Sequence, residues 1–285
     1  MKLFYDPRCL DYHSPGHPER PQRVQATVDR LKASHPEWDW LPVEPVSIGD
    51  VLRAHGQFHL QRLQEPKDFD GDTAYHEGIF EIARLASGAS VGAMQAAMNG
   101  DPAFSLMRPP GHHAESNRAM GFCYLNHVVI AALVALDSGI DRVAIWDFDA
   151  HHGNGTEAIV AGMDRIQHVS VHQHPCYPGT GVVSHGNAIN YPVPPETEAS
   201  EHMSVLSSSW RSVLDSQPEL VLVSAGFDAY EKDPLTQMRL GIDDFHTLGE
   251  WLKVAKMPAA ATLEGGYSDD LPLLVDAFLK GWSGS

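Results

Sequence analysis

An aspartate and a histidine two positions apart are the first residues here that could do chemistry together. Asp149 and His151 follow the apolar run VAIWDF (143–148) in a segment close to extended geometry, so both side chains point to the same side. Asp228, after the run LVLVS (220–224), can supply a third ligand. Two carboxylates and one imidazole without a thiolate, with a fourth position left to water, fit catalytic zinc. Ferrous iron or cobalt suits the same set, so the metal stays open.

Two further groups could act as acid, base or hydrogen-bond donor beside such a metal. His112 and His113 follow Pro-Pro-Gly, a stiff turn that can present two adjacent rings. One ring can take a proton from water and later protonate the leaving group, while the other stabilises charge. Asp147 or Asn154 would set their protonation. Tyr267 follows two glycines that let the backbone pass close to a site, and its phenol could donate to a developing oxyanion.

Taken singly, these residues are more typical of turns, helix caps and packed side chains than of a site, but they share one position in the predicted architecture. Short apolar runs of strand type alternate with amphipathic helical patterns, which predicts one doubly wound α/β domain with a mainly parallel sheet and helices on both faces. The strong predicted strands are 103–107, 143–148, 168–172, 220–224 and 259–263, with a weaker one at 3–5. The predicted helices are 21–33, 77–98, 126–137, 201–214, 243–254 and 271–279. Because ligands bind outside the carboxyl ends of parallel strands, the polar clusters that follow five of these strands indicate one site.

The amino-acid composition limits which kinds of partner and function this protein can have. The 285 residues contain 20 Lys+Arg, 37 Asp+Glu and 17 His, for a net charge of −17, which argues against a nucleic-acid partner and suggests metal chemistry or a cationic substrate. The three cysteines form no C-x-x-C pair, and neither a signal peptide nor a membrane span is evident, so we expect a cytoplasmic protein. We expect the domain to cover 1–282 and the Ser-Gly-Ser tail (283–285) to lie outside it. Histidines away from the motifs, such as His35, His55 and His59, are predicted to be surface polar groups.

Six motifs in this order resemble the zinc-dependent histone deacetylase and acetylpolyamine amidohydrolase family: RPPGHHA, GFCYLN, DFDAHHGNGT, YPGTG, SAGFDA and LEGGY. The early HSPGHPERP (13–21) is similar to the family's N-terminal motif, and the match extends to Tyr267. The HHGNGT and LEGGY forms are more similar to the class II branch, which includes bacterial members. His127 departs from the smaller polar residue expected after GFCYLN. The resemblance implies the arginase/deacetylase fold and hydrolysis of an N-acyl amide.

The resemblance also implies two cation sites. Asp149, His151 and Asp228 would hold one zinc ion per chain. A monovalent cation, usually potassium, would lie close by and use Asp147, Asp149, His151 and Ser170, partly through backbone oxygens.

For catalysis, the resemblance makes His113 the general base and then the general acid. His112 becomes its electrostatic partner, held by Asp147. Asn154 stands where class I proteins carry an aspartate, so His113 loses a charged partner, which could move its pKa. Tyr267 would polarise the amide carbonyl and stabilise the oxyanion.

The resemblance assigns a substrate tunnel as well. Phe122 and Tyr177 match its aromatic walls, the Gly121 carbonyl matches the acceptor for the scissile amide N–H, and Leu235 matches a position at the mouth. Arg20 matches a residue near a product-release channel.

The substrate follows less directly from the sequence. Acyl-lysine in peptides and acetylated polyamines are both cationic candidates, and acyl length and oligomeric state stay open. Leu235, where polyamine-specific relatives often carry an acidic residue, and the short segment between His59 and Glu77 favour acyl-lysine. An arginase-like ureohydrolase with two manganese ions would need carboxylates where Gly153 and Tyr230 stand. A non-catalytic acyl-lysine binder would typically lack one of the site residues, all of which are present.

Overall fold

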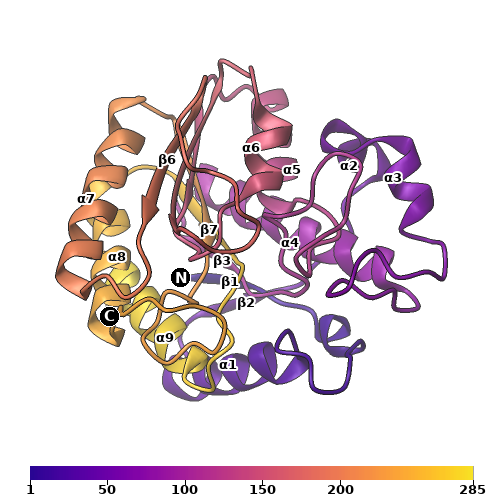
Figure 1. Cartoon of the computed structure of the whole chain (residues 1–285), viewed down its shortest axis with the longest axis horizontal. Coiled ribbons are helices and arrows are strands. Elements are labelled where there is room, and N and C mark those ends of the chain that lie inside the picture. The colour runs from indigo at the N-terminus through magenta and orange to yellow at the C-terminus, as the bar shows by residue number, and fades with distance from the viewer. Residues whose placement is uncertain (285) are drawn as a thin grey trace.

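Eight strands form a single sheet in which all paired neighbours run parallel, in the order β2-β1-β3-β8-β7-β4-β5-β6. The computed structural model describes residues 1–284, and Figure 1 shows the sheet between layers of helices. The strands are β1 Lys2–Phe4, β2 Asp39–Leu41, β3 Ala103–Ser105, β4 Val143–Asp147, β5 Ile166–Gln173, β6 Ala188–Val193, β7 Leu220–Ala225 and β8 Ala259–Leu263. The predicted α/β class and parallel sheet are therefore confirmed.

All six predicted strands are present, and the sequence prediction lacks the two at the sheet edges. β2 has three residues that are exposed or half-buried, and β6 alternates buried with half-buried or exposed residues and contains Pro192. β2 is too short to stand out, and Asn190 and Pro192 interrupt β6, so neither was predicted as a strand. The central strands β4, β7 and β8 are buried throughout, as expected for a sheet covered on both faces.

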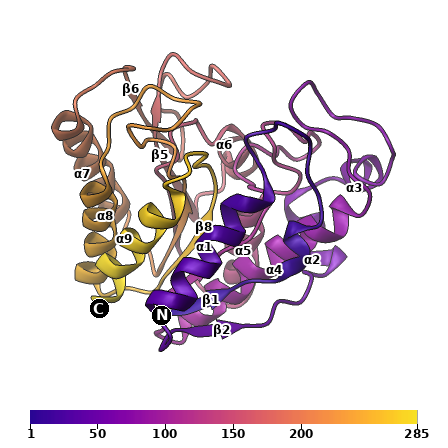
Figure 2. The same ribbon diagram turned by 90° about the horizontal axis from the view of Figure 1, so that it is seen from below.

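Helices cover both faces of the sheet (Figures 1 and 2). α4, α5 and α6 contact one face, while α7 contacts β4, β5 and β6 from the other, where α1, α8 and α9 pack together. The helices are η1 Pro7–Leu10, α1 Pro21–Ser34, α2 Ile48–Ala54, α3 Gln57–Arg62, α4 Ile79–Met98, α5 His127–Asp137, α6 Asn154–Val160, α7 Ala199–Asp215, α8 Ile242–Ala255 and α9 Leu271–Ser283. The sequence prediction lacks η1, α2, α3 and α6, each of which has at most seven residues.

The C-terminal boundary differs by one residue from the expectation. α9 includes Ser283, and Gly284 ends it in the left-handed conformation with φ 75°. Ser285 lies outside the described residues. Within residues 1–284, no helix combines the length and apolar character that a bilayer crossing requires.

A buried ion pair ties the N-terminal segment to the turn that carries the histidine pair. Arg108 is fully buried, and its Nε and Nη2 donate to the two carboxylate oxygens of Glu19 at 2.8 and 2.6 Å. Its Nη1 donates to the backbone oxygens of Cys9 and Tyr12. Burial opposes ionisation of Glu19, but Arg108 outweighs it and lowers the pKa from the ordinary 4.5 to about 2.

Replacing Glu19 with glutamine is expected to lower the free energy of unfolding by about 3–5 kcal/mol, because it leaves the buried Arg108 charge without an ionised partner. Urea denaturation at pH 7 measures this effect. Glu81→Gln, which removes an exposed partner of Arg84, is the matched control and should cost less than about 1 kcal/mol. Since the folded-state pKa of Glu19 is depressed, its contribution is fully present above pH 4.5 and declines as pH falls toward 2. Equal losses in the two variants would contradict this assignment.

Candidate metal centre and active site

Three side chains converge beyond the carboxyl ends of β4 and β7. One ligand atom from each of Asp149, His151 and Asp228 lies within 4.8 Å of the others. His151 Nδ1 is 2.7 Å from Asp228 Oδ2 and 3.3 Å from Asp149 Oδ1. The structure thus brings together the three residues whose strand-end positions predicted a metal site.

The electrostatics of this triad favour a bound cation. Asp149 and Asp228 are fully buried, and burial together with the charge of Asp149 raises the pKa of Asp228 to about 7. Burial also opposes ionisation of Asp149, but the neighbouring His112 and His151 outweigh it and lower its pKa. Two buried carboxylates and an imidazole nitrogen fit a divalent ion of the zinc type, which would neutralise the charge they concentrate here.

Backbone groups hold the two carboxylates in place. The Gly265 N–H donates to Asp149 Oδ2 and the Ala150 N–H donates to Asp228 Oδ1, both at 2.7 Å. A Cβ on Gly265 would lie 2.6 Å from Asp149 Oδ2 and 2.5 Å from Asp228 Oδ2, so this close approach requires glycine. The first glycine of the Gly-Gly pair before Tyr267 therefore lets the backbone reach both carboxylates of the candidate metal site.

The described part of the chain offers no comparable site for a second metal. Among residues 1–284, the triad is the one group of three or more His, Cys, Asp or Glu donors close enough to hold an ion. Gly153 and Tyr230 occupy the positions where a two-metal ureohydrolase would need carboxylates. The donor set therefore favours chemistry with one divalent metal.

His112 is held as the charged member of the histidine pair. Its Nδ1 lies 3.0 Å from Asp147 Oδ2, and the N–H groups of Gly111 and His112 donate to Glu264 Oε2 at 2.6 and 3.2 Å. Burial disfavours a charge on His112, but Asp149 and Asp147 outweigh it and raise its pKa to about 10. Glu264, whose pKa burial raises to about 7, was not predicted as a site residue. It is the first residue after β8, so the strand end marks its position, but its contacts with the distant backbone of Gly111 and His112 could not be foreseen.

His113 is the neutral member of the pair. Its Nδ1 lies 2.8 Å from Asn154 Oδ1, and its ring centroid is 4.0 Å from that of His112. Burial, and then the charges of His112 and His151, lower the pKa of His113 well below 6.5. Gly121, with φ 56°, passes so close that a Cβ there would lie 2.5 Å from the His113 ring. His113 is therefore poised to accept a proton at neutral pH.

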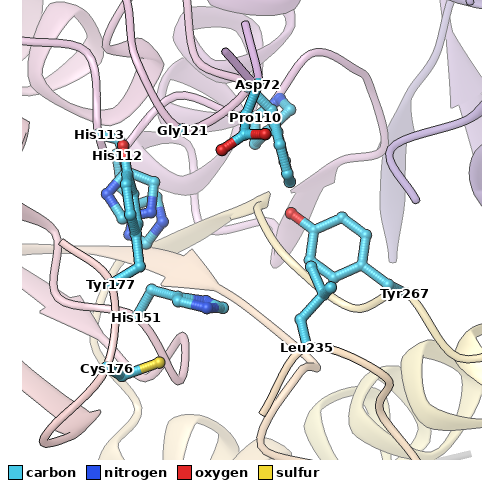
Figure 3. Close-up of a pocket in the computed structure, with 11 residues that line it drawn as sticks. Asp72, Pro110, His112, His113, Gly121, His151, Cys176, Tyr177, Leu235 and Tyr267 are labelled. Atoms are coloured by element: carbon cyan, nitrogen blue, oxygen red, sulfur yellow. The ribbon is translucent and has the colours of Figure 1, made fainter. Parts of the chain in front are cut away.

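Tyr267 lies on the opposite side of the cavity from the histidines (Figure 3). Its N–H donates to Asp233 Oδ2 at 2.7 Å, and the Arg23 guanidinium lies 4.5 Å from the centre of its ring. Arg23 also donates to the backbone oxygens of Gly266 and Glu264. Burial raises the pKa of Tyr267 well above 10, so the phenol stays protonated and able to donate. Arg23 and Asp233 fix the turn that presents Tyr267, and neither was predicted.

A cavity of about 290 Å³ connects these groups to the surface. It is lined by all four predicted tunnel residues: Gly121, Phe122, Tyr177 and Leu235. The cavity is also lined by a carboxylate and a thiol that the sequence did not predict there. Asp72 contributes an acidic group, and Cys176 lies beside His151 (Figure 3). Asp72 lies in a loop without regular secondary structure, so no periodicity marked it.

The structure also places the residues expected at the potassium site and at the product-release channel. Ser170 is buried on β5 directly beside Asp147 on β4, so the structure brings these two proposed potassium ligands together. Arg20, by contrast, pairs with Asp269 at the protein surface. The buried arginine next to the Gly-Gly-Tyr turn is Arg23.

The prediction that the remaining histidines lie on the surface is wrong for His35, His55 and His59. Their exposed fractions are 5%, 2% and 1%. His55 Nδ1 and His59 Nε2 lie 3.0 and 2.8 Å from the backbone oxygens of Glu115 and Tyr124. His127, the departure from the motif, likewise places Nε2 3.0 Å from an oxygen of the Pro-Pro-Gly turn. An imidazole can be buried when a ring nitrogen finds a hydrogen-bond partner in the protein, and sequence spacing does not reveal that partner.

Comparison with known protein families agrees with this geometry. Residues 17–280 match the family model described as "Histone deacetylase domain". The chain belongs to the histone deacetylase family. The prediction of a deacetylase-type amide hydrolase is thereby confirmed.

Relatives within the histone deacetylase family carry two kinds of name. A protein of Archaeoglobus fulgidus named "Probable deacetylase" is 35% identical, over 93% of this chain and 80% of its own. The solved structure of the HDA15 HD domain superposes with a TM-score of 0.94 at 28% identity, covering 100% of this chain and 91% of that one. An acetylpolyamine aminohydrolase from Burkholderia pseudomallei gives a TM-score of 0.88 at 26% identity, covering 99% and 98%. These matches confirm the predicted arginase/deacetylase fold.

Proposed function

We propose that this histone deacetylase homologue removes acetyl or other short acyl groups from lysine side chains with one zinc ion per chain. The observation that carries the proposal is the cavity itself. Phe122 and Tyr177 line it together with the histidine pair, Tyr267 and His151, one of the three candidate metal ligands. In Figure 3 the histidines and Tyr267 face one another across the cavity. An unbranched amine stem fits between aromatic walls of this kind.

Each residue has a role that follows from its position. A divalent metal held by Asp149, His151 and Asp228 acidifies water and polarises a carbonyl oxygen when bound. His113 Nε2 accepts the proton of the attacking water and returns it to the leaving amine. The positively charged His112 stabilises the negative charge that develops nearby.

The other groups orient the substrate. The Tyr267 hydroxyl donates to the carbonyl oxygen of the acyl group as it gains negative charge. The Gly121 carbonyl accepts the amide N–H, and Leu235 contacts the stem near the mouth. A potassium ion beside Asp147 and Ser170, with oxygens of Asp149 and His151, would stabilise the loop that carries two of the metal ligands. A cytoplasmic location stays a prediction.

Acetylated polyamines are the second candidate substrate, and Asp72 is the observation that favours them. Its carboxylate lines the same cavity and could pair with a distal amine. Leu235 offers no second acidic group on its side of the cavity, which favours the lysine side chain. Acetylated polyamines carry further amines beyond the scissile amide, whereas an acyl-lysine side chain leads to a peptide backbone. Kinetic measurements on both kinds of substrate can therefore distinguish them.

The deciding experiment compares kcat/KM of the zinc-loaded protein on acetyl-lysine peptides, longer acyl-lysine peptides, N-acetylputrescine and N-acetylspermidine. We expect a peptide to be the best substrate. A higher kcat/KM for either polyamine would move the assignment to the second class, and hydrolysis of none would overturn the proposed function.

Replacing Tyr267 with phenylalanine is expected to lower kcat on the best substrate by about 10²–10³-fold with little change in KM, because the hydroxyl contributes mainly in the transition state. Steady-state kinetics measure the effect. Tyr191→Phe, which removes a hydroxyl bonded to Ser212, is the control. A Tyr267→Phe enzyme within threefold of wild type would remove Tyr267 from the mechanism.

A further inference from the structure

A hydrogen-bond chain behind His113 ends at Glu115, a carboxylate that the proposed reaction does not otherwise use. His113 Nδ1 lies 2.8 Å from Asn154 Oδ1, and Asn154 Nδ2 donates to Glu115 Oε1 at 3.0 Å. Met120 Sδ is a second, weaker acceptor at 3.5 Å from the same nitrogen. Both acceptors lie on one side of the amide, so they turn its nitrogen toward Glu115 and its oxygen toward His113.

This orientation decides where His113 carries its proton. An amide oxygen can only accept, so the neutral ring must place its hydrogen on Nδ1 and keep the lone pair on Nε2. If the Asn154 amide turned over, its NH₂ would face Nδ1, and the ring would move its proton to Nε2. A base with Nε2 already protonated cannot accept a proton from water there.

We propose that Glu115 is a positioning residue that fixes the tautomer of His113 through the amide of Asn154. An aspartate next to the histidine would need no such partner, because both of its oxygens accept. The asparagine in this chain has one accepting and one donating end, and Glu115 selects between them. This inference rests on the proposed role of His113 as the general base.

The loop that carries Glu115 is held independently of its side chain. The backbone oxygen of Glu115 accepts from His55 Nδ1 at 3.0 Å, and His55 Nε2 accepts from the Asn126 N–H at 2.9 Å. The Glu115 N–H donates to Arg118 O at 2.9 Å. Changes to the Glu115 side chain should therefore leave the backbone where it is.

The first test measures kcat and KM on the best acyl substrate with the zinc-loaded protein. Glu115→Ala should lower kcat by about 10–100-fold and leave KM within about twofold of wild type. Glu115→Gln should recover most of the loss, since its amide oxygen can accept from Asn154 Nδ2. Asn117→Ala, an exposed change in the same loop, should leave both constants unchanged. A Glu115→Ala kcat within twofold of wild type would overturn the proposal.

The second test uses Asn154→Asp as a background. An aspartate has no amide to turn over, so Glu115→Ala should lower kcat by less than about twofold in this background. A rise in kcat is also compatible with the proposal, because the change removes repulsion between two carboxylates. An equal loss of kcat in both backgrounds would show that Glu115 acts only on the structure of the loop, and would overturn the proposal.

A third test does not depend on turnover. The ¹⁵N shifts of labelled histidines, with His113 assigned by its loss in His113→Gln, should show a protonated Nδ1 in wild type and a protonated Nε2 in Glu115→Ala. The same tautomer in both proteins would overturn the inference about Glu115. If wild type hydrolyses no acyl substrate while the shifts change as expected, the proposed function fails and the positioning role stands.

Discussion

Removing the divalent metal with a chelator is expected to lower deacylase activity by at least about 10³-fold, and one equivalent of zinc should restore it. A metal at such a site contributes several kcal/mol by polarising the carbonyl and acidifying water. Without a cation, the buried carboxylates of Asp149 and Asp228 share one small site, where burial and Asp149 already raise the pKa of Asp228 to about 7. Metal content by mass spectrometry, measured together with kcat/KM, checks the expectation.

The metal should also stabilise the fold. A ligand that binds only the native state at about 1,000 times its Kd adds about 4 kcal/mol to the free energy of unfolding, so Tm should rise when zinc is added to the chelated protein. Asp228→Asn should abolish this rise together with stoichiometric zinc binding. Asp215→Asn, an exposed change at the end of α7, should alter neither. Full activity in protein shown to be metal-free would contradict the site, and restoration only by two manganese ions with turnover of arginine would favour the ureohydrolase.

The convergence of the proposed metal ligands and the proposed catalytic groups was predictable because the sheet imposes their position. Strands β4 and β7 are buried throughout and mostly apolar, so their carboxyl ends could be located, and Asp149, His151 and Asp228 follow shortly after those ends. Tyr267 was predictable for the same reason, since it follows β8. A parallel sheet gathers such ends at one edge, which turns sequence spacing into spatial proximity.

The residues that support the site were not predictable in this way. Glu264, Arg23 and Asp233 act through hydrogen bonds to backbone groups far away in sequence, and no periodicity records such contacts. His55 and His59 were expected at the surface because histidine is polar. Their burial depends on carbonyl groups of a loop whose path was unknown. Edge strands β2 and β6 were missed because a half-exposed strand lacks the apolar run that identifies a central one.

Replacing His113 with alanine is expected to lower kcat by about 10²–10⁴-fold with KM nearly unchanged, because the ring moves a proton in the transition state and does not hold the substrate. Its pKa lies well below 6.5 through burial and the charges of His112 and His151. The wild-type base is therefore already unprotonated at pH 6.5, and its activity should decline only at lower pH. His246→Ala, a change at a half-buried position on α8 away from the site, is the matched control.

The same experiment separates the two histidines. His112 is positively charged over the working range, since Asp149 and Asp147 outweigh burial and raise its pKa to about 10. It can stabilise negative charge but has no free lone pair with which to accept a proton. His113→Ala should therefore cost more in kcat than His112→Ala, and it should remove the decline in activity at low pH. If instead His112→Ala removes that decline and costs more in kcat, then His112 is the base and the roles of the two rings are exchanged.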